Sequence, residues 1–176
     1  MIETIQQINF LLAIGGIGTL AVTLVLLFDL LTKRKLAPYV KIWGLTVAFL
    51  ATTGAVSMTL VYSEIFGLIP CGLCWFERIA LYPQALLLAV AIWCKDTGVA
   101  RYGIALSSFG LIVSLYHHYL QMGGSQFIKC PLAGAGADCA KRFMFEFDFI
   151  TFPLLAAILF AFLIVLYSYL LRTRDI

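Results

Sequence analysis

Five long apolar runs, separated by short polar segments, constrain this chain more than any other feature of its sequence. Each run is close to the roughly 20 residues that a helix needs to cross the hydrocarbon core of a bilayer. Hydrocarbon offers backbone groups no hydrogen-bond partner, so runs that do not alternate like barrel strands must be helical. The sequence therefore predicts an all-α, polytopic membrane helix bundle with five transmembrane helices. Their expected ranges are Ile8 to Leu31, Ile42 to Tyr62, Trp75 to Cys94, Tyr102 to Leu120 and Ile150 to Leu171.

The composition excludes a soluble globular domain. Hydrophobic residues make up 62% of the chain, charged residues make up 12%, and the mean hydropathy is +1.00. Soluble domains are about half apolar. The net charge of +3 is small, and most basic residues lie between the apolar runs. This pattern is typical of topology signals rather than of a nucleic-acid-binding surface, so we expect no nucleic-acid partner.

The positions of Lys and Arg predict the orientation in the membrane. The first run is preceded by Glu3 and by no basic residue, unlike a cleaved signal peptide, and the cluster "KRK" follows it. Because cytoplasmic segments are enriched in Lys and Arg, the N-terminus is expected outside and the C-terminus in the cytoplasm. Eight of the 12 basic residues then face the cytoplasm: Lys33, Arg34, Lys35, Lys41, Lys95, Arg101, Arg172 and Arg174. The others are Arg78, Lys129, Lys141 and Arg142.

This topology divides the five cysteines between the two sides of the membrane. Cys71, Cys74, Cys130 and Cys139 fall on the outer, oxidising side, and Cys94 alone faces the cytoplasm. No motif surrounds Cys94, so we expect it to be a spare thiol. Four cysteines can pair in three ways, and the sequence does not choose among them.

The stretch "IPCGLCWFERI" places a Cys-x-x-Cys pair at the outer end of the third run. Pro70 before the pair favours a helix start, where unpaired N–H groups and the helix dipole stabilise a thiolate. Arg78 lies four residues after Cys74 on the same helical face and adds positive charge, which Glu77 opposes. The arrangement indicates a redox-active dithiol, and a structural disulfide or half of a metal site remain alternatives.

Charged and polar side chains also lie unusually deep in the expected helices. Arg78 is about 6 Å into the third run, where a charge marks a functional site unless its side chain extends back to the interface. His117 and His118 end the fourth run at a similar depth. With Arg78 they could bind a small polar group, such as a carbonyl of a lipid-soluble cofactor. The histidines and cysteines could instead form a zinc or copper site, although the two cysteine pairs lie on separate loops.

Cys130 and Cys139 bracket a short loop rich in Gly and Ala. A flexible, exposed loop suits attack on a disulfide by an incoming thiolate. A disulfide that only staples the loop would have the same sequence signature.

Four stretches together resemble the DsbB family of quinone-coupled disulfide oxidoreductases. They are "PCGLCWFERIALYP", "YHHYLQM", "KC…DCAKR" and "FDFITFPLL", and the resemblance covers about Ile42 to Leu171. It implies a membrane enzyme that reoxidises a DsbA-like thioredoxin-fold thiol oxidase and drives disulfide formation outside the cytoplasm. The DsbA–DsbB–quinone system is the established example of a compartment kept oxidising by kinetics. It also implies residence in a prokaryotic plasma membrane.

The resemblance assigns residues to a quinone site. Cys71 and Cys74 match the family's pair that passes electrons to membrane quinone, either ubiquinone or menaquinone. Cys74 would be the thiolate that contacts the quinone ring. Arg78 and His118, rather than His117, match the family's quinone-binding arginine and histidine. No metal is implied.

The resemblance gives the second pair a different partner. Cys130 and Cys139 match the pair that exchanges with the soluble thiol oxidase, and Cys130 would be the cysteine attacked to form the mixed disulfide. The loop between them is shorter than is usual in the family.

The chain also departs from the family in its number of spans. Family members have four, so residues 1–41 are expected to form an extra N-terminal transmembrane helix and a cytoplasmic linker. Residues 42–171 would form the four-helix core with two outer redox loops, and residues 172–176 a cytoplasmic tail.

Three other functions fit parts of the pattern. A vitamin K epoxide reductase-like protein also couples a Cys-x-x-Cys to quinone, but places it in its last core helix. A metal-binding membrane protein would use the same cysteines and histidines as ligands. A non-enzymatic scaffold would use the disulfides only as staples.

Overall fold

The computed structural model describes residues 2–32, 34–127, 130 and 138–174. Lys33, Lys129 and most of the Gly- and Ala-rich loop, residues 131–137, lie outside the described residues. Five helices are long and apolar enough to cross a membrane, and within the described ranges the only β-type pairing is an isolated bridge. The predicted all-α, five-span bundle is confirmed. The helices are α1 (Ile2–Leu31), α2 (Ala37–Leu60), α3 (Gly72–Cys94), α4 (Val99–Gln121) and α5 (Phe152–Arg174), with a π-helical turn η1 (Val61–Ile65) continuing α2.

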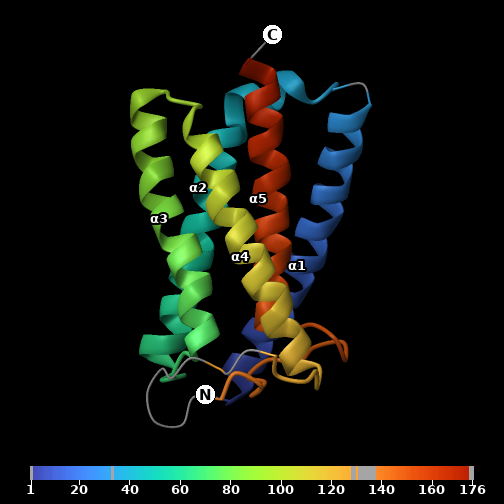
Figure 1. Ribbon diagram of the computed structural model, residues 1–176, viewed down its shortest axis with the longest axis vertical. Helices are drawn as coiled ribbons and strands as arrows, with labels where there is room; N and C mark the ends of the chain where they lie inside the picture. The colour runs from blue at the N-terminus through green and yellow to red at the C-terminus, as the bar shows by residue number, and fades with distance from the viewer. Residues whose placement is uncertain (1, 33, 128–129, 131–137, 175–176) are drawn as a thin grey trace.

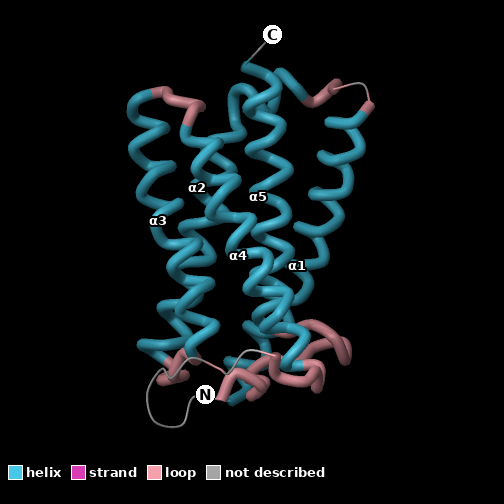
Figure 2. Tube along the Cα trace, viewed as in Figure 1, coloured by secondary structure: helices cyan, strands magenta, loops and turns pink. Residues whose placement is uncertain are grey.

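The helices run up and down, so the connections gather at two ends (Figures 1 and 2). The start of α1, the segment between η1 and α3 and the described residues between α4 and α5 lie at one end. The end of α5 and the described residues of the two short connections, from α1 to α2 and from α3 to α4, lie at the other. We call the first of these the cysteine end, because it carries Cys71, Cys74, Cys130 and Cys139. Cys94 lies at the opposite end, at the close of α3.

Helix α5 is the centre of the bundle and packs against α1, α2 and α4, while α3 packs against α2 and α4. Glycines on α4 allow its close contact with α5. A Cβ atom at Gly103 would stand 2.5 Å from the ring of Tyr167, and one at Gly110 would stand 2.4 Å from the ring of Phe160. Small residues let helices approach closely in membranes, where packing drives association.

A buried polar network links three of the helices near mid-bundle. The side-chain oxygen of Gln84 on α3 accepts hydrogen bonds from Ser107 on α4 at 3.2 Å and from Tyr167 on α5 at 3.0 Å. The Gln84 amide nitrogen donates to the carbonyl of Ala80 at 2.9 Å, so both of its polar atoms are bonded. These bonds fix how α3 and α4, which carry the site described below, are rotated relative to α5.

Helix α2 changes to a π-helical turn before it reaches the cysteine end. Such turns are rare and often occur at functional sites, because they widen the helix and redirect side chains. Tyr62 in this turn is buried, and its hydroxyl donates to Asn9 of α1 at 2.5 Å. The bond ties α1 to the rest of the bundle at the cysteine end.

Candidate functional site

The site begins where α3 begins. Cys71 is the N-cap residue of α3, with an extended backbone, and its sulfur accepts a hydrogen bond from the backbone N–H of Cys74 at 3.3 Å. Pro70 precedes it, as predicted for a helix start. The cysteine pair therefore sits on the positive end of the helix dipole.

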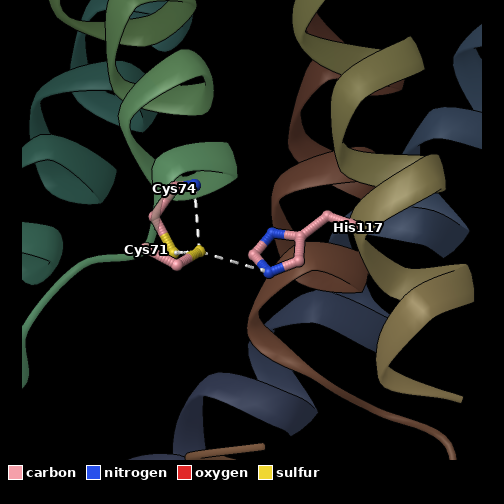
Figure 3. A group of neighbouring side chains, drawn as sticks. All are labelled: Cys71, Cys74 and His117. Carbon is pink, nitrogen blue, oxygen red and sulfur yellow. Dashed lines mark hydrogen bonds between the residues drawn. The ribbon is translucent and has the colours of Figure 1, made fainter. Parts of the chain in front are cut away.

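The two sulfurs of the motif face one another. Cys71 and Cys74 are free thiols with their Sγ atoms 2.7 Å apart, and the Nε2 atom of His117 lies 3.6 Å from the sulfur of Cys71 (Figure 3). The hydrogen bond from Cys74, and then the hydrogen bond and charge of His117, lower the pKa of the Cys71 thiol against the opposing effect of burial. The arrangement can stabilise a thiolate at Cys71 and needs little movement to close a disulfide within the motif.

His117 is held by a carboxylate from the neighbouring helix. Its Nδ1 atom lies 3.0 Å from Oε1 of Glu77, and the two side chains are 2% and 14% exposed. A carboxylate accepts hydrogen bonds, so Nδ1 carries a proton, and Nε2 can take the proton of the Cys71 thiol and then donate a hydrogen bond to the thiolate. The side chain of Gln121 lies 3.4 Å from the same Nε2 atom and donates to the carbonyl of Lys141 at 3.1 Å.

The sequence offered His117 only together with His118, as a possible ligand of a polar group or a metal, and it did not predict a role for Glu77 in the site. Glu77 was considered only as a charge opposing Arg78, and the resemblance favoured His118. A signal was present, because Glu77 follows Cys74 by three residues and thus lies on the same side of the helix. His118 instead points to the start of α5, where its Nδ1 atom lies 2.9 Å from the hydroxyl of Thr151.

Arg78 is directed toward α2. Its Nη2 atom donates to the carbonyl of Thr59 at 3.1 Å, and its guanidinium lies 5.4 Å from the centre of the Trp75 ring. Among the described residues, no carboxylate lies within ion-pairing distance of it. The remaining N–H groups of Arg78 are therefore not committed to a carboxylate.

Cys74, Glu77 and Arg78 reach a cavity of about 480 Å³ bordered by α1, α2, α3 and α5. Ligand pockets commonly have volumes of about 300–1,000 Å³. Most of the lining is apolar, and the charged groups come from α3 near the cysteine end. Among the described residues, the lining includes neither His117 nor His118.

The second cysteine pair meets the first. Cys130 and Cys139 form a disulfide with their Cα atoms 6.0 Å apart. Cys139 is fully buried in one apolar cluster with Cys71, and Cys74 and Cys130 pack against that cluster. The fold thus brings both pairs together at the cysteine end, although they come from different inter-helix segments.

The comparisons with known proteins identify the family. The family model described as "Disulfide bond formation protein DsbB" matches residues 41–170. The chain belongs to the DsbB family. It is 38% identical to the SPbeta prophage-derived disulfide bond formation protein B of Bacillus subtilis over 70% of this chain and 81% of that protein. It is also 38% identical to a probable disulfide formation protein of Oceanobacillus iheyensis, over 82% of this chain and 96% of that protein. No solved structure matches the chain.

Membership of the DsbB family confirms the resemblance seen in the sequence and makes the chain a membrane disulfide formation protein, an oxidoreductase. A second relative in Bacillus subtilis, named disulfide bond formation protein C, is 36% identical over 72% of this chain.

One part of this DsbB-family site could also hold a metal ion. The two sulfurs of Cys71 and Cys74 and a ring nitrogen of His117 all lie within 4.8 Å of one another. This donor set suits Zn²⁺ or Cu⁺, and a carboxylate on the far nitrogen of a histidine is a common support for a metal-bound ring. The cluster needs only the first cysteine pair, so the separation of the two loops does not prevent it.

Proposed function

We propose that this DsbB-family protein reoxidises a DsbA-like thioredoxin-fold thiol oxidase and passes the electrons to membrane quinone. The observation that carries the proposal is the shared position of Cys74. It packs against the buried cluster that holds one cysteine of each pair, Cys71 and Cys139, and it also lines the apolar cavity that Arg78 reaches. A thiol in both places can receive electrons from an aqueous loop and deliver them to a ligand in lipid.

Electrons and protons are conserved in the two thiol–disulfide exchange steps, and no further oxidant is needed for them. A thiolate of the reduced partner attacks the Cys130–Cys139 disulfide at Cys130 and forms a mixed disulfide, and the partner's second thiol resolves it. The partner leaves oxidised, and Cys130 and Cys139 are left as thiols. This dithiol then reduces a Cys71–Cys74 disulfide by the same exchange, so two electrons and two protons move to the membrane-proximal pair.

The cavity suits a quinone. A bound quinone would accept two electrons and two protons and leave as a quinol. Arg78 can donate a hydrogen bond to a carbonyl oxygen, Cys74 presents its sulfur to the cavity, and the Glu77–His117 pair can take the proton of the Cys71 thiol. His118, which the resemblance favours, lies outside the lining, so its contact with quinone is a prediction to be tested beside His117.

The proposed orientation places the cysteine end outside a prokaryotic plasma membrane. It is supported by the described basic residues at the opposite end: Arg34, Lys35, Lys41, Lys95, Arg101 and Arg172. The family model begins at residue 41. We therefore propose that residues 1–41 are an addition to a four-helix core formed by residues 42–171, with residues 172–176 as a cytoplasmic tail.

Reconstituted turnover tests the proposed function. The purified protein receives a reduced thioredoxin-fold thiol oxidase and a quinone, and quinone reduction is followed by absorbance. We expect turnover by the wild type and loss to background in Cys74→Ser and Cys130→Ser, because each variant interrupts one pair. Cys94→Ser is the matched control and should retain full activity.

A metal-binding function is the second candidate, because Cys71, Cys74 and His117 form a ligand cluster. Stoichiometric zinc or copper in the purified protein, combined with no turnover of any quinone, would favour it. Full activity of Cys74→Ser would instead indicate that the disulfides serve only as staples.

A further inference from the structure

Helix α1 forms one side of the cavity that Cys74 and Arg78 reach, although it precedes the residues that match the DsbB family model. Leu12, Gly15 and Thr19, on one face of α1, are among the lining residues. The helix is therefore part of the proposed quinone site rather than only a membrane anchor. The position raises the question of what α1 contributes to binding.

The attachments of α1 leave a space between it and α2. Helix α1 packs along α5, and within the described ranges it has no comparable packing on α2 (Figure 1). Asn9 and Tyr62 join it to η1 at the cysteine end. At the other end, Asp29 accepts hydrogen bonds from the backbone N–H groups of Lys35 and Leu36 and from the hydroxyl of Tyr169. Both ends of α1 are fixed, and the cavity lies between these ties.

Glycines keep this space open from both sides. Gly15 on α1 and Gly54 on α2 both line the cavity, and a Cβ atom at either would meet no heavy atom within 4 Å. Gly16 differs, because a Cβ there would stand 2.3 Å from the side chain of Leu155 on α5. Gly15 and Gly16 both line the cavity, and Gly16 also allows close contact with α5.

The shape and polarity of the cavity indicate what kind of ligand fits it. The lining extends along α2 and into η1, from Leu50 to Tyr62, which is about 18 Å of helix. Its charged groups, Glu77 and Arg78, come from α3 near the cysteine end, and most of the rest is apolar. The hydroxyl of Thr19 is already bonded to the carbonyl of Gly15 at 2.8 Å. An elongated ligand with one polar head and a long apolar tail matches this distribution.

We propose that α1 is the outer wall of the quinone site and covers the isoprenoid tail of the bound quinone. The inference rests on the proposed function, which supplies the head group at Cys74 and Arg78. Lipid is as apolar as the tail, so burial from water does not drive the tail into the cavity. Its binding depends on close packing, and the tail therefore responds strongly to any side chain that occupies its space.

A pair of α1 variants tests the wall. Gly15→Leu places a side chain in the cavity. Gly18→Leu is the control: it places the same side chain on α1, where a Cβ atom also has no neighbour within 4 Å, but Gly18 does not line the cavity. We expect Gly15→Leu to raise the KM for a long-tailed isoprenoid quinone about tenfold or more, a loss of about 1.4 kcal/mol of binding per factor of ten. The KM for a tail-less quinone with the same ring should stay unchanged, and Gly18→Leu should change neither.

A binding measurement accompanies the kinetics. A quinone with a photoreactive group on its tail should label the α1 segment around Gly15 in the wild type, and Gly15→Leu should lower that labelling while Gly18→Leu does not. Labelling confined to other helices, or equal KM changes for both quinones, would overturn the role of α1 while leaving quinone reduction intact. A wild type that reduces no quinone would overturn the proposed function and this inference with it.

Discussion

Two neighbouring histidines have different partners in this protein. His117 contacts Cys71 and Glu77, whereas His118 contacts Thr151 at the start of α5. Successive helical residues point about 100° apart, so the rotation of α4 decides which histidine faces the cysteines. That rotation depends on contacts of α4 with other helices, and spacing in the sequence does not reveal it.

The two histidines should differ in their effect on the Cys71 thiol. Because His117 lowers the pKa of Cys71, its replacement in His117→Ala should raise that pKa, so the thiolate appears only at higher pH. The measurement is the ultraviolet thiolate absorbance of the reduced protein against pH, taken as the difference from Cys71→Ser. His118→Ala is the matched control and should leave the midpoint in place. A larger shift in His118→Ala than in His117→Ala would contradict the assignment.

Arg78 should affect quinone use and not partner exchange. Loss of a hydrogen bond from a charged group costs about 1.5–3 kcal/mol, so Arg78→Ala should raise the quinone KM by roughly ten- to a hundredfold. Exchange between the reduced partner and the Cys130–Cys139 disulfide, followed by stopped-flow without quinone, should keep its rate. Arg78→Lys retains the charge, so its quinone KM should lie between that of the wild type and that of Arg78→Ala. An unchanged quinone KM in Arg78→Ala would remove this residue from the site.

At the level of helices, the sequence predicted most of the fold. The third apolar run lies within α3, the fourth lies within α4, and the fifth overlaps nearly all of α5. They agree because long apolar runs in a membrane can only be helical. Helix α1 begins at Ile2 rather than Ile8, since its polar first turn continues the helix beyond the apolar run. The π-helical turn Val61–Ile65 was not predicted, because hydropathy does not distinguish it from an α-helical turn.

The contact between α4 and α5 should be sensitive to a single methyl group. In Gly110→Ala the new Cβ would overlap the ring of Phe160, and overpacking of this kind costs about 1–3 kcal/mol. We expect a lower thermal unfolding midpoint for the detergent-solubilised protein. Gly54→Ala adds the same methyl group in a helix where nothing lies within 4 Å, so its midpoint should not fall. Equal midpoints for the two variants would show that this contact is looser than described.

For the whole molecule, the sequence predicted five spans and the separation of Cys94 from the other cysteines, and the described part of the fold confirms both. The exchange that the resemblance implies requires the two cysteine pairs to meet, but the sequence did not predict that they pack around one buried cluster. This packing depends on where Cys130 and Cys139 lie at the cysteine end, and the composition of the loop that carries them does not determine their positions.

The proposed orientation can be tested in intact cells. Cys94 is exposed at the end opposite the redox cysteines, so a membrane-impermeant maleimide should label it only after the cells are permeabilised. Ser125→Cys, with all native cysteines replaced by serine, puts a thiol on the exposed surface of the cysteine end and should be labelled without permeabilisation. The reverse pattern would invert the topology and place the disulfide chemistry on the reducing side.

The packing of α1 along α5 has a consequence for how the protein is made. Helix α1 leaves the ribosome before the other four, and α5 leaves it after them. During synthesis α1 must therefore remain in the bilayer without the main helix that it will contact. The cavity between α1 and α2 lacks its α5 residues until insertion is complete, so a chain stalled before α5 would carry the first cysteine pair in the membrane without a finished ligand site beside it.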